Sequence, residues 1–317
     1  MSTITLKQLS KDIHDFVAFK KSLGFKYERN VFSLRSFERF AKTHAKGNKV
    51  VWESTLAMWL ARYPIRNRKT VSVDFGTIEQ LCLFRQRRQP NCFVPDRNLL
   101  PRNVQTRFLP YVFSVDQIHF LLDAAQQYQS RSISESTLYH FLLTLYCTGL
   151  RPGECARLTA KDADLVTGVF TIHESKGKTR LVPFGEDLAT KLCSYRKENE
   201  SIALDNISLW VRRDGTPVPV ATMLKTVSQL FRHSGLKPSR GRKGPRPYDV
   251  RHTYAVHRLT RWYEQGIDIH AHLPWLSAYM GHDNVLGTEV YLHATPELLQ
   301  IASDRFARYV QPEGIAR

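Results

Sequence analysis

Hydrophobic residues recur at helical spacing through most of the chain. In the first hundred residues, four segments carry an apolar residue every three or four positions, which is typical of amphipathic helices around one core. The first segment ends at Gly24, a residue that often terminates helices. The pattern predicts a helical domain over residues 1–95. The apolar positions are Leu6, Leu9, Ile13, Phe16 and Val17; Val31, Leu34, Phe37 and Ala41; Leu56, Trp59 and Leu60; and, in a helix opened by Ser72, Ile78, Leu81 and Phe84.

Prolines break up the stretch that follows this domain. Pro90, Pro95, Pro101 and Pro110 stand among Arg and Asn residues, which is the composition of an extended connector. We therefore expect a linker over residues 96–110 and a second domain over residues 111–317.

The second domain has a mainly helical pattern with one stretch of strands. Ser114 and Gln117 are spaced as a helix capping box, a further helical run ends at Gly149, and Pro152 opens a short helix. In residues 169–183, VFTIHE and TRLVP alternate on either side of SKGK, which predicts a β-hairpin with a basic tip. The predicted fold is mainly α with a small β-sheet. Further helices are expected over residues 186–198, 220–234, 249–265, 274–280 and 296–309.

The charge of the chain indicates a polyanionic partner. The 317 residues include 46 Lys and Arg against 29 Asp and Glu, a net charge of +17, and 42% are hydrophobic, which excludes a disordered chain. Residues 1–100 alone hold 19 Lys and Arg against 8 Asp and Glu, as expected of a domain that follows a phosphate backbone. These residues are not gathered beside one apolar helix face, so a membrane surface is the less favoured partner.

Composition also bears on location and metals. No window reaches the ~18 apolar residues of a membrane span, and the start MSTITLKQLS lacks the apolar core of a signal peptide. We expect a cytoplasmic protein. The five cysteines are odd in number and form no CxxC pair, so we expect reduced thiols. His270 and His272 have no nearby Cys or acidic partner, and no metal or cofactor is predicted.

Four short motifs in the second domain carry its chemistry. They are TGLRPGE (148–154), ESKGKTRLVP (174–183), RPYDVRHTYAV (246–256) and MGHDNVLGTEVYLH (280–293). In this order they resemble the tyrosine recombinases, the phage integrase family. The resemblance covers residues 111–310, and over the N-terminal third it rests only on a basic helical domain joined by a linker. It implies a SAM-like DNA-binding domain followed by a catalytic domain.

The resemblance assigns roles to three basic residues and one histidine. Arg151 and Arg251 match the two active-site arginines, and paired guanidiniums suit the charge that grows on a phosphodiester under attack. Lys176 matches the hairpin lysine that protonates the departing 5′ oxygen, although Lys178 could fill the same role. His282 matches the histidine that donates a hydrogen bond to the phosphate or assists proton transfer.

Tyr291 matches the nucleophile of the family. A phenol with an ordinary pKa near ~10 is protonated at neutral pH, and we expect the nearby arginines to favour its phenolate form. Attack on DNA leaves a 3′-phosphotyrosyl bond and a free 5′ hydroxyl. Because this ester keeps the energy of the broken bond, another 5′ hydroxyl can reverse the step without ATP or a metal.

The second motif departs from the family pattern. The family usually has His-x-x-Arg, whereas this chain has Tyr248 before Arg251; a phenol can still donate one hydrogen bond toward a phosphate. His252 is expected to pack within a helix, with a replacement acid or base as the alternative. The 31 residues from Arg251 to His282 exceed the common family interval.

Several basic residues are candidates for contacts with the DNA backbone. One group closes the fourth helix and another lies in the loop SRGRKGPRP (239–247), whose alternative interpretation is a solvated loop. The candidate DNA-binding residues are Arg85, Arg87, Arg88, Lys178, Arg240, Arg242 and Lys243.

The resemblance implies a site-specific recombinase that acts on double-stranded DNA, for integration or transposition of a mobile element. We expect a homotetramer on DNA, or a tetramer with related recombinases. The terminal helix (296–309) is expected to dock on a neighbouring protomer or to pack on its own chain. Two alternatives stay open: DNA relaxation like that of a type IB topoisomerase, and an accessory DNA-binding protein that has lost cleavage.

Overall fold

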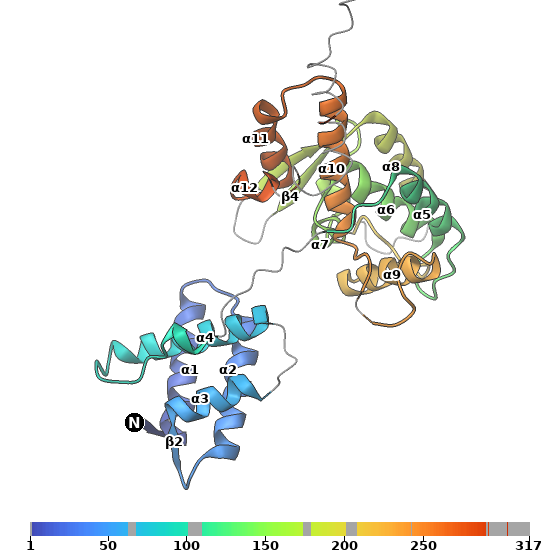
Figure 1. The fold of residues 1–317 in the computed structure, drawn as a ribbon. Coiled ribbons are helices and arrows are strands. Elements are labelled where there is room, and N and C mark those ends of the chain that lie inside the picture. Colours follow the sequence, from blue (N-terminus) through green and yellow to red (C-terminus); the bar gives the residue numbers. More distant parts are fainter. Residues whose placement is uncertain are drawn as a thin grey trace, which may run out of the picture. The chain divides into compact units, whose positions relative to one another are not determined.

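The chain divides into two compact units, residues 1–107 and 108–317. The structure is a computed structural model that describes residues 2–62, 68–100, 110–173, 179–200, 208–241, 243–289, 291 and 303. Figure 1 traces both units. Residues 101–109 of the predicted linker, and all but one residue of the predicted terminal helix, lie outside the described residues.

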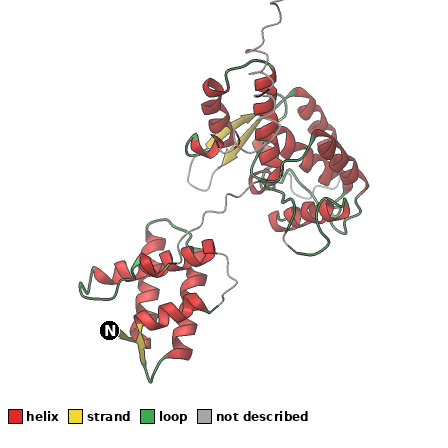
Figure 2. Ribbon diagram, in the orientation of Figure 1, coloured by secondary structure: helices red, strands yellow, loops and turns green. Residues whose placement is uncertain are grey.

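The N-terminal unit is built from helices and one short pair of strands (Figure 2). Thr5 caps the first helix, where its side chain accepts a hydrogen bond from the backbone N–H of Gln8 at 3.2 Å. The elements are β1 (Thr3–Thr5), α1 (Leu6–Ser22), α2 (Glu28–His44), β2 (Lys49–Val51), α3 (Trp52–Ala61), α4 (Arg68–Gln86) and a 3₁₀ turn (Arg97–Leu99).

Aromatic residues form the centre of this unit. Trp52, Trp59 and Phe37 are fully buried and pack ring to ring. Strands β1 and β2 run antiparallel, and the paired Ile4 and Val50 are both buried against the same core. The pairing therefore ties the start of the chain to the start of α3.

Arg85 is buried in this unit, which contradicts its predicted contact with DNA. Its side chain is 6% exposed, and Nε donates to Asp12 of α1 at 2.5 Å. Asp12 also accepts from Gln8 at 2.7 Å. The apolar stripe of α4 turns Arg85 inward, whereas Arg87 and Arg88 are exposed at the end of the helix. Arg88 pairs with Asp15 at 3.2 Å.

In its described residues, the C-terminal unit contains the hairpin strands and the helices predicted before residue 290, so the mainly α fold with a small sheet is confirmed. The sheet has the order β3-β4-β5 and is antiparallel, with Thr171 opposite Leu181. The elements are α5 (Val115–Gln127), α6 (Glu135–Thr148), α7 (Pro152–Cys155), β3 (Ala163–Asp164), β4 (Val169–His173), β5 (Thr179–Pro183), α8 (Glu186–Asn199), α9 (Val220–His233), α10 (Asp249–Glu264), α11 (Ile269–Met280) and α12 (Leu286–Glu289), with a 3₁₀ turn (Ala160–Asp162) before β3.

Two helices begin earlier than their sequences predict. Helix α4 begins at Arg68 and not at Ser72. Helix α11 begins at Ile269, and Pro274, expected at its start, lies inside it. The side chain of Asp268 caps α11 by accepting from the backbone N–H groups of His270 and Ala271. This cap satisfies the first turn and sets the start of the helix.

Two glycines end the helices that lead into the motifs. Gly149 closes α6 with φ +60°, and Gly281 closes α11 with φ +69°, a left-handed conformation that costs glycine little. A Cβ atom at Gly149 would lie 2.2 Å from the ring of Tyr254. The turns at these glycines direct Arg151 and His282 toward the first turn of α10.

Candidate active site

Arg251 lies at the centre of the site, in the first turn of α10, and is fully buried. Its Nη1 donates to the carbonyl of Gly149 at 2.8 Å, and its Nη2 donates to the carbonyl of Met280 at 2.6 Å. Nη2 also lies 3.0 Å from Nε2 of His282. The carbonyls at the ends of α6 and α11 therefore hold this guanidinium in place.

The contacts of His282 fix its tautomer. A guanidinium only donates, so Nε2 of His282 accepts from Arg251. Nδ1 then carries the hydrogen and donates to Oγ1 of Thr288 at 2.7 Å. Burial, together with the charges of Arg251 and Arg151, lowers the pKa of His282 to about 4. The imidazole is neutral at pH 7, and the nitrogen beside Arg251 accepts a hydrogen bond.

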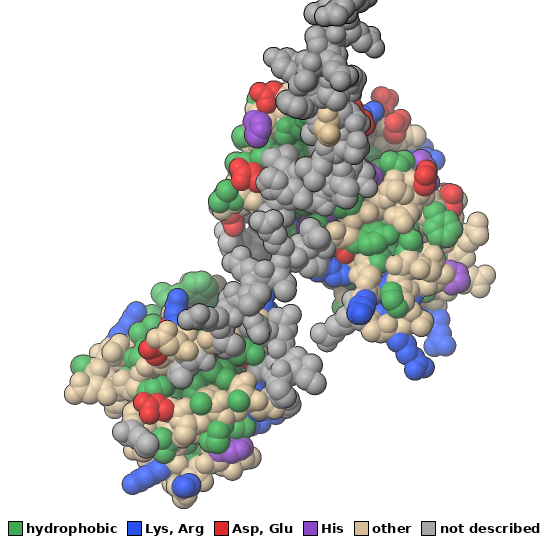
Figure 3. Space-filling view, in the orientation of Figure 1, with side chains coloured by type: hydrophobic (Ala, Val, Ile, Leu, Met, Phe, Trp, Pro, Cys, Tyr) green, Lys and Arg blue, Asp and Glu red, His purple; other side chains and the backbone are tan. Residues whose placement is uncertain are grey.

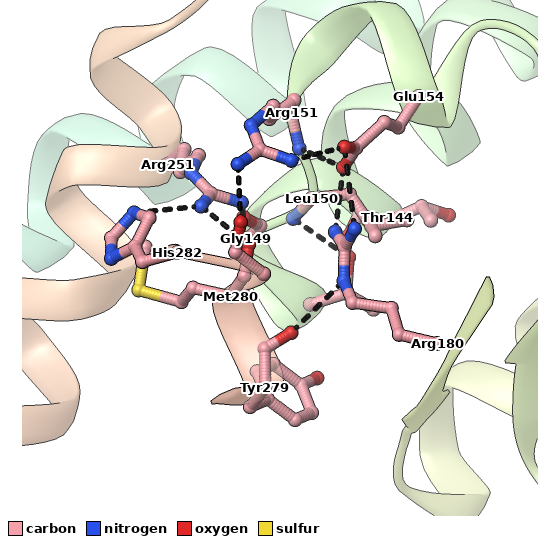
Figure 4. A network of polar contacts seen from close by, with 12 residues as sticks. Thr144, Gly149, Leu150, Arg151, Glu154, Arg180, Arg251, Tyr279, Met280 and His282 are labelled. Carbon is pink, nitrogen blue, oxygen red and sulfur yellow. Dashed lines mark hydrogen bonds and ion pairs between the residues drawn. The ribbon is translucent and has the colours of Figure 1, made fainter. Parts of the chain in front are cut away.

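Arg151 and a buried carboxylate form the other side of the site (Figure 4). Nη1 of Arg151 donates to Glu154 at 2.6 Å, and Nη2 donates to the carbonyl of Gly281. Arg180 of β5 also donates to Glu154, at 2.7 Å. Burial opposes ionisation of Glu154, but the hydrogen bonds from Arg180 and Arg151 outweigh it and lower the pKa of the carboxyl. One carboxylate thus orients two arginines.

Sequence reasoning missed Arg180 and Glu154 as parts of the site. Arg180 shares a strand face with the fully buried Val182, and a charged residue on a buried face was the available signal. Glu154 stands three residues after Arg151, where its side chain accepts from the backbone N–H of Arg151 at 3.1 Å. Lys176 and Lys178, at the hairpin tip, lie outside the described residues.

Tyr291 is 3% exposed, and its hydroxyl lies 2.9 Å from Nδ1 of His252. Its ring stacks at 6.4 Å from the ring of His282. Burial raises the pKa of Tyr291 to about 12 and outweighs the charges of Arg251 and Arg151, which lower it. The arginines favour the phenolate as expected, but burial has the larger effect. The phenol is protonated and needs an acceptor for its proton.

Tyr248 lies at the edge of the site, immediately before α10, and is 38% exposed. Its ring lies 5.0 Å from that of His252. Tyr248 also lines a cavity of about 750 Å³ that opens beside Arg151. Other residues lining this cavity include Glu154, Arg157, His173, Lys225, Ser228 and Arg246. The lining is rich in cations, as a site for phosphates would be.

The basic loop before α10 is held by two cations from its own base. Lys237 is buried and donates to the carbonyl of Pro245 at 2.9 Å, and Arg232 donates to the carbonyls of Gly241, at 2.9 Å, and Pro238. Arg240 and Lys243 are exposed, and Arg242 lies outside the described residues. Figure 3 shows Lys and Arg side chains projecting from this part of the unit, next to α9.

Metal-binding clusters and membrane spans are absent from the described part of the chain. No three His, Cys, Asp or Glu residues there are placed to hold a metal ion, and no helix there could cross a membrane. His270 and His272 lie in the first turn of α11, where Nδ1 of His272 lies 2.9 Å from the carbonyl of Asp268.

Similarity to known proteins identifies the family of the chain. Residues 112–297 match the sequence model of the phage integrase family. The y4rB protein of Sinorhizobium fredii (strain NBRC 101917 / NGR234), whose name describes an integrase or recombinase, is 30% identical over 93% of this chain and 96% of its own length. The chain belongs to the phage integrase family.

Further relatives of this integrase-family chain are tyrosine recombinases. XerC of Bacillus subtilis (strain 168) is 24% identical over 74% of this chain and 73% of its own length. The structure of the XerH recombinase bound to palindromic difH substrate covers 88% of this chain and 79% of that chain, with a TM-score of 0.66 and 17% identity. The Tn1549 transposon integrase in complex with transposon right end DNA covers 96% and 100%, with a TM-score of 0.65 and 18% identity. These two structures share the fold.

The family predicted from four motifs is confirmed, and with it an enzyme that recombines DNA. In this integrase-family chain, Arg151, Arg251, His282 and Tyr291 come from separate elements and lie in one site of a single chain. Tyr248 lines the same site, whereas Arg85 lies in the core of the N-terminal unit. His252 contacts Tyr291, a contact that its position beside Arg251 did not predict.

Proposed function

We propose that this tyrosine recombinase cleaves and rejoins double-stranded DNA at specific sites through a 3′-phosphotyrosyl bond to Tyr291. The observation that supports this most strongly is the position of the Tyr291 hydroxyl, buried beside His252 and surrounded by the charges of Arg251 and Arg151. The proposal assigns DNA binding to residues 1–95, a linker to residues 96–110 and catalysis to residues 111–317.

The proposed roles follow from the chemistry of each group. Arg151 and Arg251 hold the non-bridging oxygens of the scissile phosphate and stabilise the charge that grows there. Lys176, or Lys178 in its place, protonates the departing 5′ oxygen. Tyr248, on the rim of the cavity, donates a hydrogen bond to the phosphate. His282 keeps the guanidinium of Arg251 in position.

Contacts with the DNA backbone are proposed for the exposed basic residues. Arg87 and Arg88 extend from the end of α4, and Arg240 and Lys243 extend from the loop that Lys237 and Arg232 hold. A loop fixed before binding loses little conformational freedom when it meets a phosphate. Lys178 and Arg242 are proposed on their sequence positions alone.

The proposed biological role is movement of a mobile element, in the cytoplasm, by a tetramer of this chain or of this chain with related recombinases. The similarity to y4rB and the fold shared with a transposon integrase support the class of reaction. The cationic rim of the catalytic cavity supports DNA as the substrate.

Covalent capture from a randomised DNA library tests the proposal and finds the target site in the same step. A library of nicked duplexes with a randomised centre is incubated with the protein, and duplexes that remain bound after denaturation are sequenced. With a nick beside the cleavage point, cleavage releases a short fragment that carries the free 5′ hydroxyl. Once this fragment diffuses away it cannot attack the phosphotyrosyl bond, so the adduct accumulates. We expect the protein to select one sequence and Tyr291→Phe to form no adduct while still binding that duplex.

The same experiment has outcomes that contradict the proposal. An adduct that survives in Tyr291→Phe would assign the nucleophile to another residue, and no adduct from the wild-type chain would favour an accessory DNA-binding protein. Supercoiled plasmid carrying one or two copies of the selected site then separates the remaining activities. Relaxation without exchange between two sites would favour a type IB topoisomerase activity.

A further inference from the structure

We propose that His252 accepts the proton of Tyr291 as the phenol oxygen attacks the scissile phosphate. This inference rests on the proposed function and adds a catalytic residue to it. Nδ1 of His252 lies 2.9 Å from the Tyr291 hydroxyl, which is within the hydrogen-bond reach that a general base requires.

The other polar groups of the site are poor acceptors for this proton. Both nitrogens of His282 are engaged, one by Arg251 and the other by Thr288. The carboxylate of Glu154 is held by Arg151 and Arg180. Tyr248 is a further neighbour among the described residues, and a neutral phenol is no stronger a base than the phenol it would deprotonate.

The position of His252 on α10 explains how it reaches the nucleophile. Residues four apart on a helix lie on the same face, one above the other, so His252 lies beside Tyr248, and their rings are 5.0 Å apart. This packing fixes one side of the imidazole. The Tyr291 ring lies 5.4 Å away on another side. His252 is therefore held between two phenol rings, with Nδ1 toward the one proposed to attack.

The charge state of His252 suits a proton acceptor. Burial lowers its pKa to about 4, with Arg246 and Arg251 adding to this effect and Asp249 opposing it, so the imidazole is neutral at pH 7. His282, whose ring stacks on that of Tyr291, is also neutral. An imidazole this weakly basic takes the proton only as the oxygen–phosphorus bond forms. The negative phosphate placed beside it raises its basicity at that moment.

The step balances in atoms and electrons. The phenol oxygen of Tyr291 forms a bond to phosphorus while its proton moves to Nδ1 of His252. The bond from phosphorus to the 5′ oxygen breaks, and that oxygen takes a proton from the general acid, proposed as Lys176. In rejoining, a 5′ hydroxyl attacks phosphorus and gives its proton to the neutral amine of the proposed general acid, Lys176. The His252 imidazolium returns its proton to the departing Tyr291 oxygen.

The test is single-turnover cleavage of the captured nicked duplex by His252→Gln. Glutamine can hydrogen-bond to the phenol but cannot take its proton, so we expect cleavage at neutral pH to slow by ~10²- to 10⁴-fold, the usual contribution of a general base. We also expect a change in pH dependence. The wild-type rate should be nearly flat above neutral pH, whereas the variant rate should rise with hydroxide, about tenfold per pH unit, because solvent must then remove the proton.

Two further variants make the result specific. His257→Gln changes another histidine of α10, one that contacts the Tyr146 hydroxyl at 3.0 Å, and we expect the wild-type rate and pH profile. His252→Ala leaves space beside Tyr291, and we expect added imidazole to restore part of its cleavage. Affinity for the duplex, measured by fluorescence anisotropy, should be unchanged in both His252 variants.

Each result supports the inference or overturns it. A His252→Gln enzyme that cleaves at the wild-type rate with the wild-type pH profile overturns it, as does loss of the flat profile in Tyr248→Phe with no change in His252→Gln. A His252→Ala enzyme that binds the duplex but gains nothing from imidazole also counts against it. Failure of the proposed function looks different, because the wild-type chain would then form no adduct at all.

Discussion

At the scale of single residues, the site depends on backbone carbonyls that two glycine turns supply. The carbonyl of Gly149 accepts from Arg251, and that of Gly281 accepts from Arg151. Both residues have positive φ, so their substitution would disturb the arginines without removing a side chain from the site.

Replacement of Gly149 by alanine should therefore affect both stability and cleavage. A left-handed alanine costs ~1–2 kcal/mol, and overlap with the Tyr254 ring adds ~1–3 kcal/mol. We expect the free energy of unfolding in urea to fall by about the sum of these effects, and cleavage to slow because Arg251 shifts. The matched control is Gly235→Ala, which also has positive φ but nothing within 4 Å of the new Cβ. Equal losses in the two variants would contradict the role of the Tyr254 contact.

The two site histidines should make stability depend on pH in a defined range. The pKa of His252 and of His282 is about 4 in the folded chain, against ~6.5 for an ordinary histidine. The unfolded chain binds more protons between these values, so the stability that the neutral rings confer is complete above ~6.5 and is lost as the pH falls toward 4. We expect a loss of about 2 kcal/mol per histidine between roughly pH 7 and 5. Urea unfolding of a His252→Gln/His282→Gln variant should show a shallower dependence over this range, and an unchanged slope would refute the assignment.

At the scale of elements, the sequence predicts most helices of this fold because their apolar stripes are long and regular. The capping box of Ser114 and Gln117 is present as predicted. Strands β1 and β3 have three and two residues, which is too short to show alternation, and only their pairing in the folded chain defines them. Helix α11 contains Pro274, which masks its true start in the sequence.

In the candidate site too, the sequence predicts what depends on local motifs and misses what depends on contacts between distant residues. Arg151, Arg251, His282 and Tyr291 could be found from motifs, because each motif is local. The contacts of Arg180 and His252 join positions 26 and 39 residues apart, and no local pattern reports such contacts. For Arg85 a local pattern was misleading. The run of Arg85, Arg87 and Arg88 predicted a basic surface, but the periodicity of α4 places Arg85 on the buried side of the helix.

The ion pair between α1 and α4 gives a prediction at this scale. Asp12 pairs with the buried Arg85, whereas Asp15 on the same helix pairs with Arg88, whose side chain is 64% exposed. Asp12→Ala leaves a buried guanidinium without its carboxylate, and we expect a loss of ~3–5 kcal/mol in the free energy of unfolding. Asp15→Ala should cost less than ~1 kcal/mol. Chemical denaturation of the two variants compares them directly, and similar losses would show that burial of Arg85 has no energetic consequence.

At the scale of the whole molecule, the excess of positive charge should appear in the salt dependence of DNA binding. Each phosphate contact contributes ~0.9 to the slope of log K against log salt. Arg87→Ala, Arg88→Ala and Lys243→Ala should each reduce the slope by up to this amount. Lys197→Ala, an exposed cation of α8 outside the proposed surfaces, should not. Fluorescence anisotropy over a salt series measures the slopes, and a full set of unchanged values would remove these residues from the interface.

Because Arg251 is buried, it loses its hydration shell when the chain folds and not when DNA binds. In the chain without DNA, its guanidinium is already buried from solvent and donates hydrogen bonds to the carbonyls of Gly149 and Met280. Dehydration of an ion costs several kcal/mol. Arg251 is dehydrated when the catalytic unit folds, so this free energy is not lost again when DNA binds. A phosphate oxygen brought against this cation has no hydration shell to displace. The attraction can then strengthen as negative charge accumulates on the five-coordinate phosphorus, which is the stage at which the enzyme gains most from it.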